Sequence, residues 1–210
     1  MNSIHLRLLP ILFVVAGLGF SLECDSVQAQ DLHPSRRLSP IGIARTHIGD
    51  TYVKVTYGRP YVRERKIFGA NNDSTTYLVP FGEIWRTGAS EATEITVTDS
   101  VMFGGNHLDA GTYSIFTEPG SESWMIHITP LVGLDGTGTF DAVANVFTPV
   151  YTPESDVMAF SVPVHTLPED GVVDQFTISF EDAETGMGMG KNMVLRWERT
   201  EVRVPVVGGH

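Results

Sequence analysis

The segment VPFGEIWRTGASEAT, residues 79–93, holds the side chains of this sequence that are best suited to chemistry. Trp85 and Arg86 are adjacent, Glu83 and Glu91 flank them, and a Gly-Ala turn follows. In an extended EIWRT, alternation directs Trp85 and Arg86 to opposite faces. We expect Trp85 to pack against the fold, and Arg86 either to point into a groove or to pair with Glu83 or Glu91.

More cationic side chains lie in the neighbouring segments and could converge on Arg86. Convergent arginines bind carboxylate or phosphate well, because each guanidinium group donates two parallel hydrogen bonds. Trp85 and Tyr61 would add an aromatic wall for a sugar or an aromatic group. The sequence therefore indicates a site for a small anionic or carbohydrate ligand. The predicted site residues are Arg59, Arg65, Lys66, Trp85, Arg86 and Glu91.

Two other interpretations of the same segment stay open. Glu83 with Glu91, or Glu91 with Glu94, could serve as acid and base of a hydrolase, which needs carboxyl groups about 5 to 10 Å apart. The segment could instead only hold together a structural protein of the cell envelope. An open groove with arginines favours binding, two facing carboxylates favour the enzyme, and a flat surface with paired arginines favours the structural role.

Other chemistries find little support in the sequence. We expect His127, between two isoleucines, to be a hydrogen-bonded strand histidine, and LDGTGTFDA with Asp135 and Asp141 lacks the pattern of a calcium loop. TGMGMGK lacks the spacing of a phosphate-binding loop and is expected to join two strands as a hairpin loop. The sequence therefore predicts neither a metal nor a cofactor. The histidines that follow residue 29 form no close pair and no HExxH motif: His33, His47, His107, His127, His165 and His210.

The elements that must position these residues are strands, because apolar side chains recur with a period of two. In TYVKVTYG, residues 51–58, Val53, Val55 and Tyr57 share one face, and six or more later segments alternate in the same way. The sequence therefore predicts an all-β fold, an antiparallel β-sandwich or jelly roll of about eight to ten strands. Two long stretches, 61–83 and 130–155, do not follow this pattern, and the second includes one expected short strand or helical turn around residues 140–147.

The N-terminus predicts export. An apolar run from Leu8 to Leu22 precedes Val27 and Ala29, the small residues that a signal peptidase recognises. The run is too short to span a membrane, which takes about 18 or more apolar residues. Lipidation of Cys24 is not favoured, because Glu23 precedes it. We expect a signal peptide at 1–29, a loose leader at 30–40, a single β-sandwich domain at 41–207, and a secreted or periplasmic protein.

Charge and cysteine content restrict the partners of this chain. Its formal net charge is −11, which disfavours nucleic acid as a partner. The only cysteine lies within the predicted signal peptide, so the exported chain would have neither a disulfide nor a thiol nucleophile. Nine Lys and Arg residues lie between Arg36 and Arg86, whereas residues 87–190 contain none and hold 16 Asp and Glu. A basic early third must therefore fold against an acidic middle, or stand apart from it.

Several blocks in order resemble a known family. YGRP, RKIFG, LVPFGEIWRTGASEAT, AGTYSIFTEPG and LRWE together resemble the domain of unknown function 2911, found in secreted proteins of Bacteroidota and related bacteria. The resemblance covers about residues 39–205 and implies an exported, mostly β domain whose activity is not established. The family usually has Asn at the position of Ser90. Residues 130–153 carry Gly and Thr where the family carries Trp and charged residues, so any binding wall there would differ in this chain.

Overall fold

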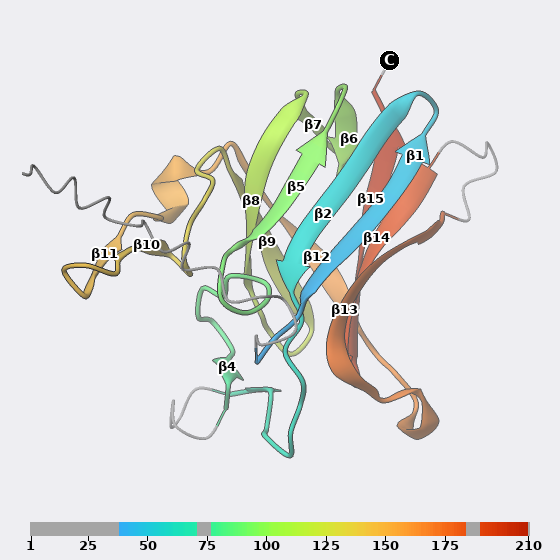
Figure 1. Ribbon diagram of the computed structural model, residues 1–210. Coiled ribbons are helices and arrows are strands. Elements are labelled where there is room, and N and C mark those ends of the chain that lie inside the picture. Colours follow the sequence, from blue (N-terminus) through green and yellow to red (C-terminus); the bar gives the residue numbers. More distant parts are fainter. Residues whose placement is uncertain (1–37, 71–76, 184–189, 210) are drawn as a thin grey trace, which may run out of the picture. The chain divides into compact units, whose positions relative to one another are not determined.

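The computed structural model describes residues 38–70, 77–183 and 190–209, which form an antiparallel β structure (Figure 1). The predicted signal peptide, most of the predicted leader and residues 185–189 of the predicted TGMGMGK hairpin loop lie outside these residues. In the described part, no helix is long and apolar enough to cross a membrane.

One large sheet of eleven strands folds into two layers, which confirms the prediction of an all-β antiparallel sandwich. It has more strands than the eight to ten predicted, partly because two three-residue strands, β6 and β7, are too short for alternation to reveal. The first layer contains β1 (Ile41–Ile48), β2 (Thr51–Gly58), β5 (Thr93–Val97), β8 (Gly111–Glu118), β9 (Ser123–Thr129) and the start of β12 (Met158–Thr166). The second contains the end of β12, β15 (Thr200–Gly208), β14 (Gly190–Glu198), β13 (Val173–Asp182), β6 (Val101–Phe103) and β7 (Asn106–Leu108).

The strand β12 joins the layers, because its first part pairs with β9 and its last three residues pair with β15. Figure 1 shows β1 and β2, in blue and cyan, in front of β15, in red. The alternating apolar side chains of both layers face inward, as in a sandwich. Val55 of β2, Ile95 of β5 and Val204 of β15 are fully buried in this core.

The end of β2 is fastened to β13 of the opposite layer. The Tyr57 hydroxyl accepts a hydrogen bond from the Ile178 N–H (2.8 Å) and donates one to the Ile178 carbonyl (3.1 Å). The Arg59 side chain donates to the Phe176 carbonyl (3.3 Å) and to the Thr177 hydroxyl (3.0 Å). These bonds fix the point at which the chain leaves β2 and enters the first non-alternating stretch.

The two stretches without alternation form small separate elements. The first contains β3 (Phe68–Gly69) and β4 (Val79–Pro80), which pair in parallel, while residues 71–76 lie outside the described part. In the second, the element expected around residues 140–147 is a hairpin of β10 (Gly138–Asp141) and β11 (Val146–Pro149), followed by the 3-10 turn η2 (Pro153–Ser155). Another 3-10 turn, η3 (Glu169–Gly171), precedes β13.

A network of charges stabilises the outer face of the second layer. Glu201 accepts hydrogen bonds from Arg196 Nε (2.5 Å) and Arg203 Nε (2.7 Å), and Arg196 Nη1 also donates to Glu181 (2.5 Å). Burial alone would raise the pKa of Glu201, but the bonds from Arg203 and Arg196 hold it below its ordinary value. The bond from Arg196 likewise lowers the pKa of Glu181, so both groups favour the folded state as carboxylates.

Candidate functional site

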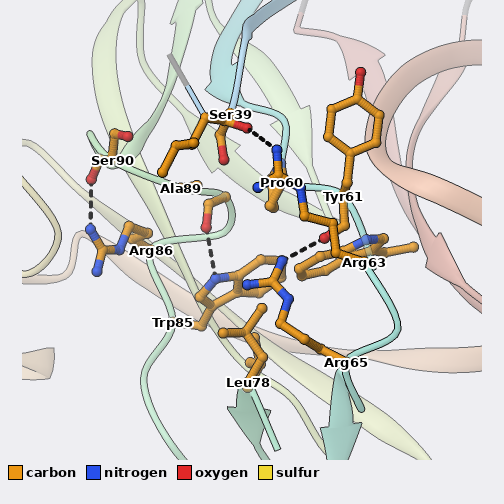
Figure 2. Close-up of a pocket in the computed structure, with 14 residues that line it drawn as sticks. Ser39, Pro60, Tyr61, Arg63, Arg65, Leu78, Trp85, Arg86, Ala89 and Ser90 are labelled. Carbon is orange, nitrogen blue, oxygen red and sulfur yellow. Dashed lines mark hydrogen bonds between the residues drawn. The ribbon is translucent and has the colours of Figure 1, made fainter. Parts of the chain in front are cut away.

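A cavity of about 300 Å³ opens between the segment that follows β2 and the loop that carries Trp85 and Arg86 (Figure 2). Its walls come from five parts of the sequence, which explains why no single motif predicts it. The lining residues are Leu38, Ser39, Pro60, Tyr61, Arg63, Arg65, Leu78, Val79, Trp85, Arg86, Gly88, Ala89, Ser90 and Trp197.

Two stacked indoles of the core lie at the inner end of the cavity, where Trp197 is only 1% exposed. The rings of Trp85 and Trp197 lie 5.8 Å apart between centroids, at an interplanar angle of 18°. Main-chain hydrogen bonds in both directions between Trp85 and Thr117 hold the loop against β8, and Trp85 Nε1 donates to the Gly88 carbonyl (3.0 Å). Trp85 is 9% exposed, so it packs as the alternation predicts. All three tryptophans of the chain contact one another or Phe68 in this cluster.

Arg86 lies at the edge of the cavity and is partly exposed. Its Nη1 donates to the Ser90 carbonyl at 2.7 Å. It also forms an ion pair with Asp135, with 3.9 Å between Nη1 and Oδ1, a partner that the sequence did not suggest. The side chains of Arg86 and Asp135 are 39% and 51% exposed, so this pair lies in the regime where an ion pair contributes little to stability.

Arg63 and Arg65 enter the cavity from the segment after β2. Arg63 Nη2 donates to the Leu38 carbonyl (3.3 Å), and Arg65 donates to the carbonyls of Val62 (3.1 Å) and Tyr61 (2.5 Å). A guanidinium group has five N–H donors, so these main-chain bonds leave donors for a ligand. Among the described residues that line the cavity there is no Asp or Glu.

The two segments that border the cavity adopt unusual backbone conformations. Of six described non-glycine residues with positive φ, four lie here: Arg63 (47°), Glu64 (60°), Thr87 (55°) and Ser90 (65°). The left-handed region costs a non-glycine residue about 1–2 kcal/mol. Such strain is typical of functional sites, where the surrounding structure must maintain it. At Ser90, the usual Asn of the family would suit this conformation better, since Asn is enriched there.

Close packing at the end of β2 supports the same loop. A Cβ on Gly58 would lie 2.0 Å from the Ala89 carbonyl oxygen, so only glycine allows β2 to pass under this loop. The Thr93 hydroxyl donates to the Thr87 carbonyl (2.6 Å) and ties the loop to β5. The sequence motifs YGRP and WRTGAS therefore form one structural unit.

The structure brings together some of the predicted site residues and separates others. Arg65, Trp85 and Arg86 line the cavity. Arg59 instead binds β13, and Lys66 Nζ lies 5.8 Å from the centroid of the Tyr77 ring. Glu91 lines a neighbouring cavity of about 250 Å³, together with Glu94, Asp135 and other residues.

Arg63, Ser90 and Trp197 also line the cavity, although they were not among the residues predicted for the site. Arg63 is two residues before Arg65 in the same basic run, which was the available signal. Trp197 lies in the late LRWE block, more than a hundred residues away in sequence, and only the pairing of β14 with its neighbours places it beside Trp85. Ser90 contributes through its carbonyl and its backbone conformation, which its residue type does not reveal.

A second polar cluster lies beneath the stretch that contains the β10–β11 hairpin. His127 Nδ1 and Asp156 Oδ2 are 2.7 Å apart, with side chains 7% and 6% exposed, which confirms the prediction of a hydrogen-bonded strand histidine. Tyr151 donates to the same carboxylate at 3.4 Å, and both burial and Asp156 raise the pKa of its hydroxyl. Tyr151 also stacks on Phe116, so the cluster fastens this stretch to the outer face of β8 and β9.

Comparison with known proteins identifies the family of this chain. The family model described as Protein of unknown function (DUF2911) matches residues 39–206, so the chain belongs to this family. No curated protein and no solved structure matches the sequence. The family description assigns no activity.

Proposed function

We propose that this member of the DUF2911 family is an exported binding protein, and that its arginine-lined cavity binds a small ligand carrying an anionic group. The main support for this proposal is the set of charged residues that line the cavity. Arg63, Arg65 and Arg86 contribute three cations, and the described lining residues include no carboxylate. Guanidinium groups in such a setting suit a carboxylate, phosphate or sulfate group.

The contrast with the rest of the protein strengthens this argument. The whole chain has a formal net charge of −11, so a concentration of arginine without acidic residues is unexpected. At physiological salt, screening reduces interactions beyond about 8 Å, so a bound anion responds mainly to the arginines around it. Asp135, 3.9 Å from Arg86, offsets part of the charge at one edge.

The apolar part of the lining suggests the body of the ligand. Tyr61 and Leu78 line the cavity and are partly exposed, which suits an aromatic ring or the apolar face of a sugar, whereas Trp85 and Trp197 are 9% and 1% exposed and support the cavity from the core. The volume of about 300 Å³ lies at the lower limit of typical small-molecule sites, which are about 300–1,000 Å³. A metabolite-sized ligand with at least one anionic group fits these features.

A hydrolase in this cavity is not favoured. The carboxylates named for that alternative include Glu91 and Glu94, which line the neighbouring cavity rather than this one. The arginines would stabilise a bound anion, but no described residue of the lining supplies the carboxylate pair that glycoside hydrolysis uses.

Export is the part of the proposal that rests on the sequence alone. The apolar run from Leu8 to Leu22 and the pair Val27 and Ala29 support cleavage after Ala29. The intact mass of the exported protein tests this directly. A chain that begins at Gln30 supports the proposal, and a chain that begins at Cys24 with a lipid attached contradicts it.

Calorimetric titration with benzoate, phosphate and D-glucuronate tests anion binding. Benzamide and D-glucose are the neutral analogues of benzoate and D-glucuronate. We expect at least one anion to bind, to bind more weakly as salt increases, and to outcompete the neutral compounds. Arg65→Gln should weaken binding about tenfold or more, since it removes a charged donor. Arg45→Gln makes the same charge change at an exposed position on β1 and should leave affinity unchanged. Equal losses in both variants, or no binding of any anion, would contradict the proposal.

A further inference from the structure

We infer that the ligand carries two anionic groups, one for each side of the cavity, joined by a less polar body. This inference rests on the proposed function and specifies its ligand class as a small dianion. It follows from the separate anchoring of the arginines.

Arg86 belongs to one side of the cavity. Its guanidinium group is held by the Ser90 carbonyl at 2.7 Å and lies against the turn that contains Asp135 and Gly136. A Cβ on Gly136 would lie 3.2 Å from Arg86 Cζ, so the guanidinium packs closely on this turn. These contacts restrain Arg86 on the side of the β10–β11 stretch.

Arg63 and Arg65 belong to the opposite side. Their donors bind the carbonyls of Leu38, Val62 and Tyr61, which all lie near the end of β2. Figure 2 shows Arg86 at the left of the cavity, whereas the side chains of Arg63 and Arg65 reach in from the right. The two sides therefore present separate sets of charged donors.

Because Figure 2 shows Arg86 on the opposite side of Trp85 from Arg63 and Arg65, a single carboxylate does not engage both sets. Bonds from a guanidinium nitrogen to a carboxylate oxygen are about 2.7–2.9 Å long, so each anionic group must sit directly against its arginine. Trp85, which Figure 2 shows between the two sets, supplies no further donor, because its Nε1 already donates to the Gly88 carbonyl. A ligand that engages both sides has a charge at each end and a less polar middle.

The backbone strain supports two points of attachment. Positive φ angles occur on both sides, at Arg63 and Glu64 on one and at Thr87 and Ser90 on the other. Each pair adjoins an arginine of the cavity, and strain of this kind is retained where it positions a functional group.

Matched pairs of linear carboxylates test the inference. Succinate, adipate and suberate are compared by calorimetry with butyrate, hexanoate and octanoate, so each pair has the same number of carbon atoms. For at least one pair, the dianion should bind about tenfold more tightly or better, as a second charge-assisted contact predicts. In Arg86→Gln that advantage should disappear, while the affinity for the monoanion stays within about twofold, because Arg63 and Arg65 still bind one carboxylate. Arg45→Gln is the control and should retain the advantage.

The possible results separate the inference from the proposed function. If monoanions and dianions bind wild-type protein equally well, the second anionic group is refuted, while anion binding itself stands. If neither series nor the anions of the previous test bind, the proposed function fails as well. The comparison of wild-type affinities needs no substitution, so it remains decisive even if Arg86→Gln does not fold.

Discussion

The substitution Arg86→Ala separates a supporting role of this side chain from a binding role. The pair with Asp135 is long and exposed, so its loss should cost about 0–1 kcal/mol. The bond to the Ser90 carbonyl adds about 0.5–1.5 kcal/mol. We therefore expect the free energy of unfolding to fall by about 1–2 kcal/mol.

Urea denaturation followed by tryptophan fluorescence measures this change, because all three tryptophans lie in the aromatic cluster of the core. With a slope near 2 kcal/mol/M, the midpoint should move down by about 0.5–1 M. Arg45→Ala, exposed on β1, is the control and should stay within about 0.5 kcal/mol of wild type. A loss of about 3–5 kcal/mol for Arg86→Ala would be the behaviour of a buried ion pair and would refute the assignment of Arg86 to an exposed edge.

Three further predictions concern the framework of the site. Glu201→Gln should lower stability at pH 7 by about 2–3 kcal/mol, less than a fully buried pair because Arg196 is partly exposed. Because the pKa of Glu201 is lowered in the folded state, its contribution to stability is present above the ordinary carboxyl pKa and is lost as pH falls through the lowered value. Between pH 7 and pH 3, the melting temperature of the variant should therefore fall less than that of the wild-type protein. Tyr57→Phe should cost about 1–3 kcal/mol in urea denaturation, since the Ile178 N–H and carbonyl lose their buried partner, and no loss would contradict the link between layers. Ser90→Asn should raise the melting temperature slightly, because Asn tolerates a φ of 65° better than Ser, and a lower value would argue against strain at this position.

The strands were predictable because a strand with one buried face has an apolar residue at every second position. The alternation of Val53, Val55 and Tyr57 predicts β2, and the structure buries all three. Trp85 was predictable in the same way, since EIWRT is extended enough to pair with Thr117 of β8. The local alternation of apolar residues is sufficient to predict a strand and its buried side chains where one face of that strand packs against the core.

The composition of the site was harder to predict, because it depends on how distant segments meet. Arg59 and Arg65 are equally plausible ligands in sequence, but Arg59 lies where β2 meets β13 and binds its main chain. Trp197 reaches the cavity through sheet pairing that no local pattern specifies. The positive φ of Thr87 helps to turn the loop at the cavity, but a threonine in the sequence does not indicate such a conformation.

The position of bound anions in a crystal tests the central claim most directly and requires no knowledge of the natural ligand. Crystals soaked in sodium iodide would show halide sites by anomalous scattering. We expect iodide in the cavity, in contact with Arg63, Arg65 or Arg86, in preference to the exposed Arg45 and Arg199. Iodide sites at those two exposed arginines, with none in an accessible cavity, would contradict the assignment of this cavity as an anion site.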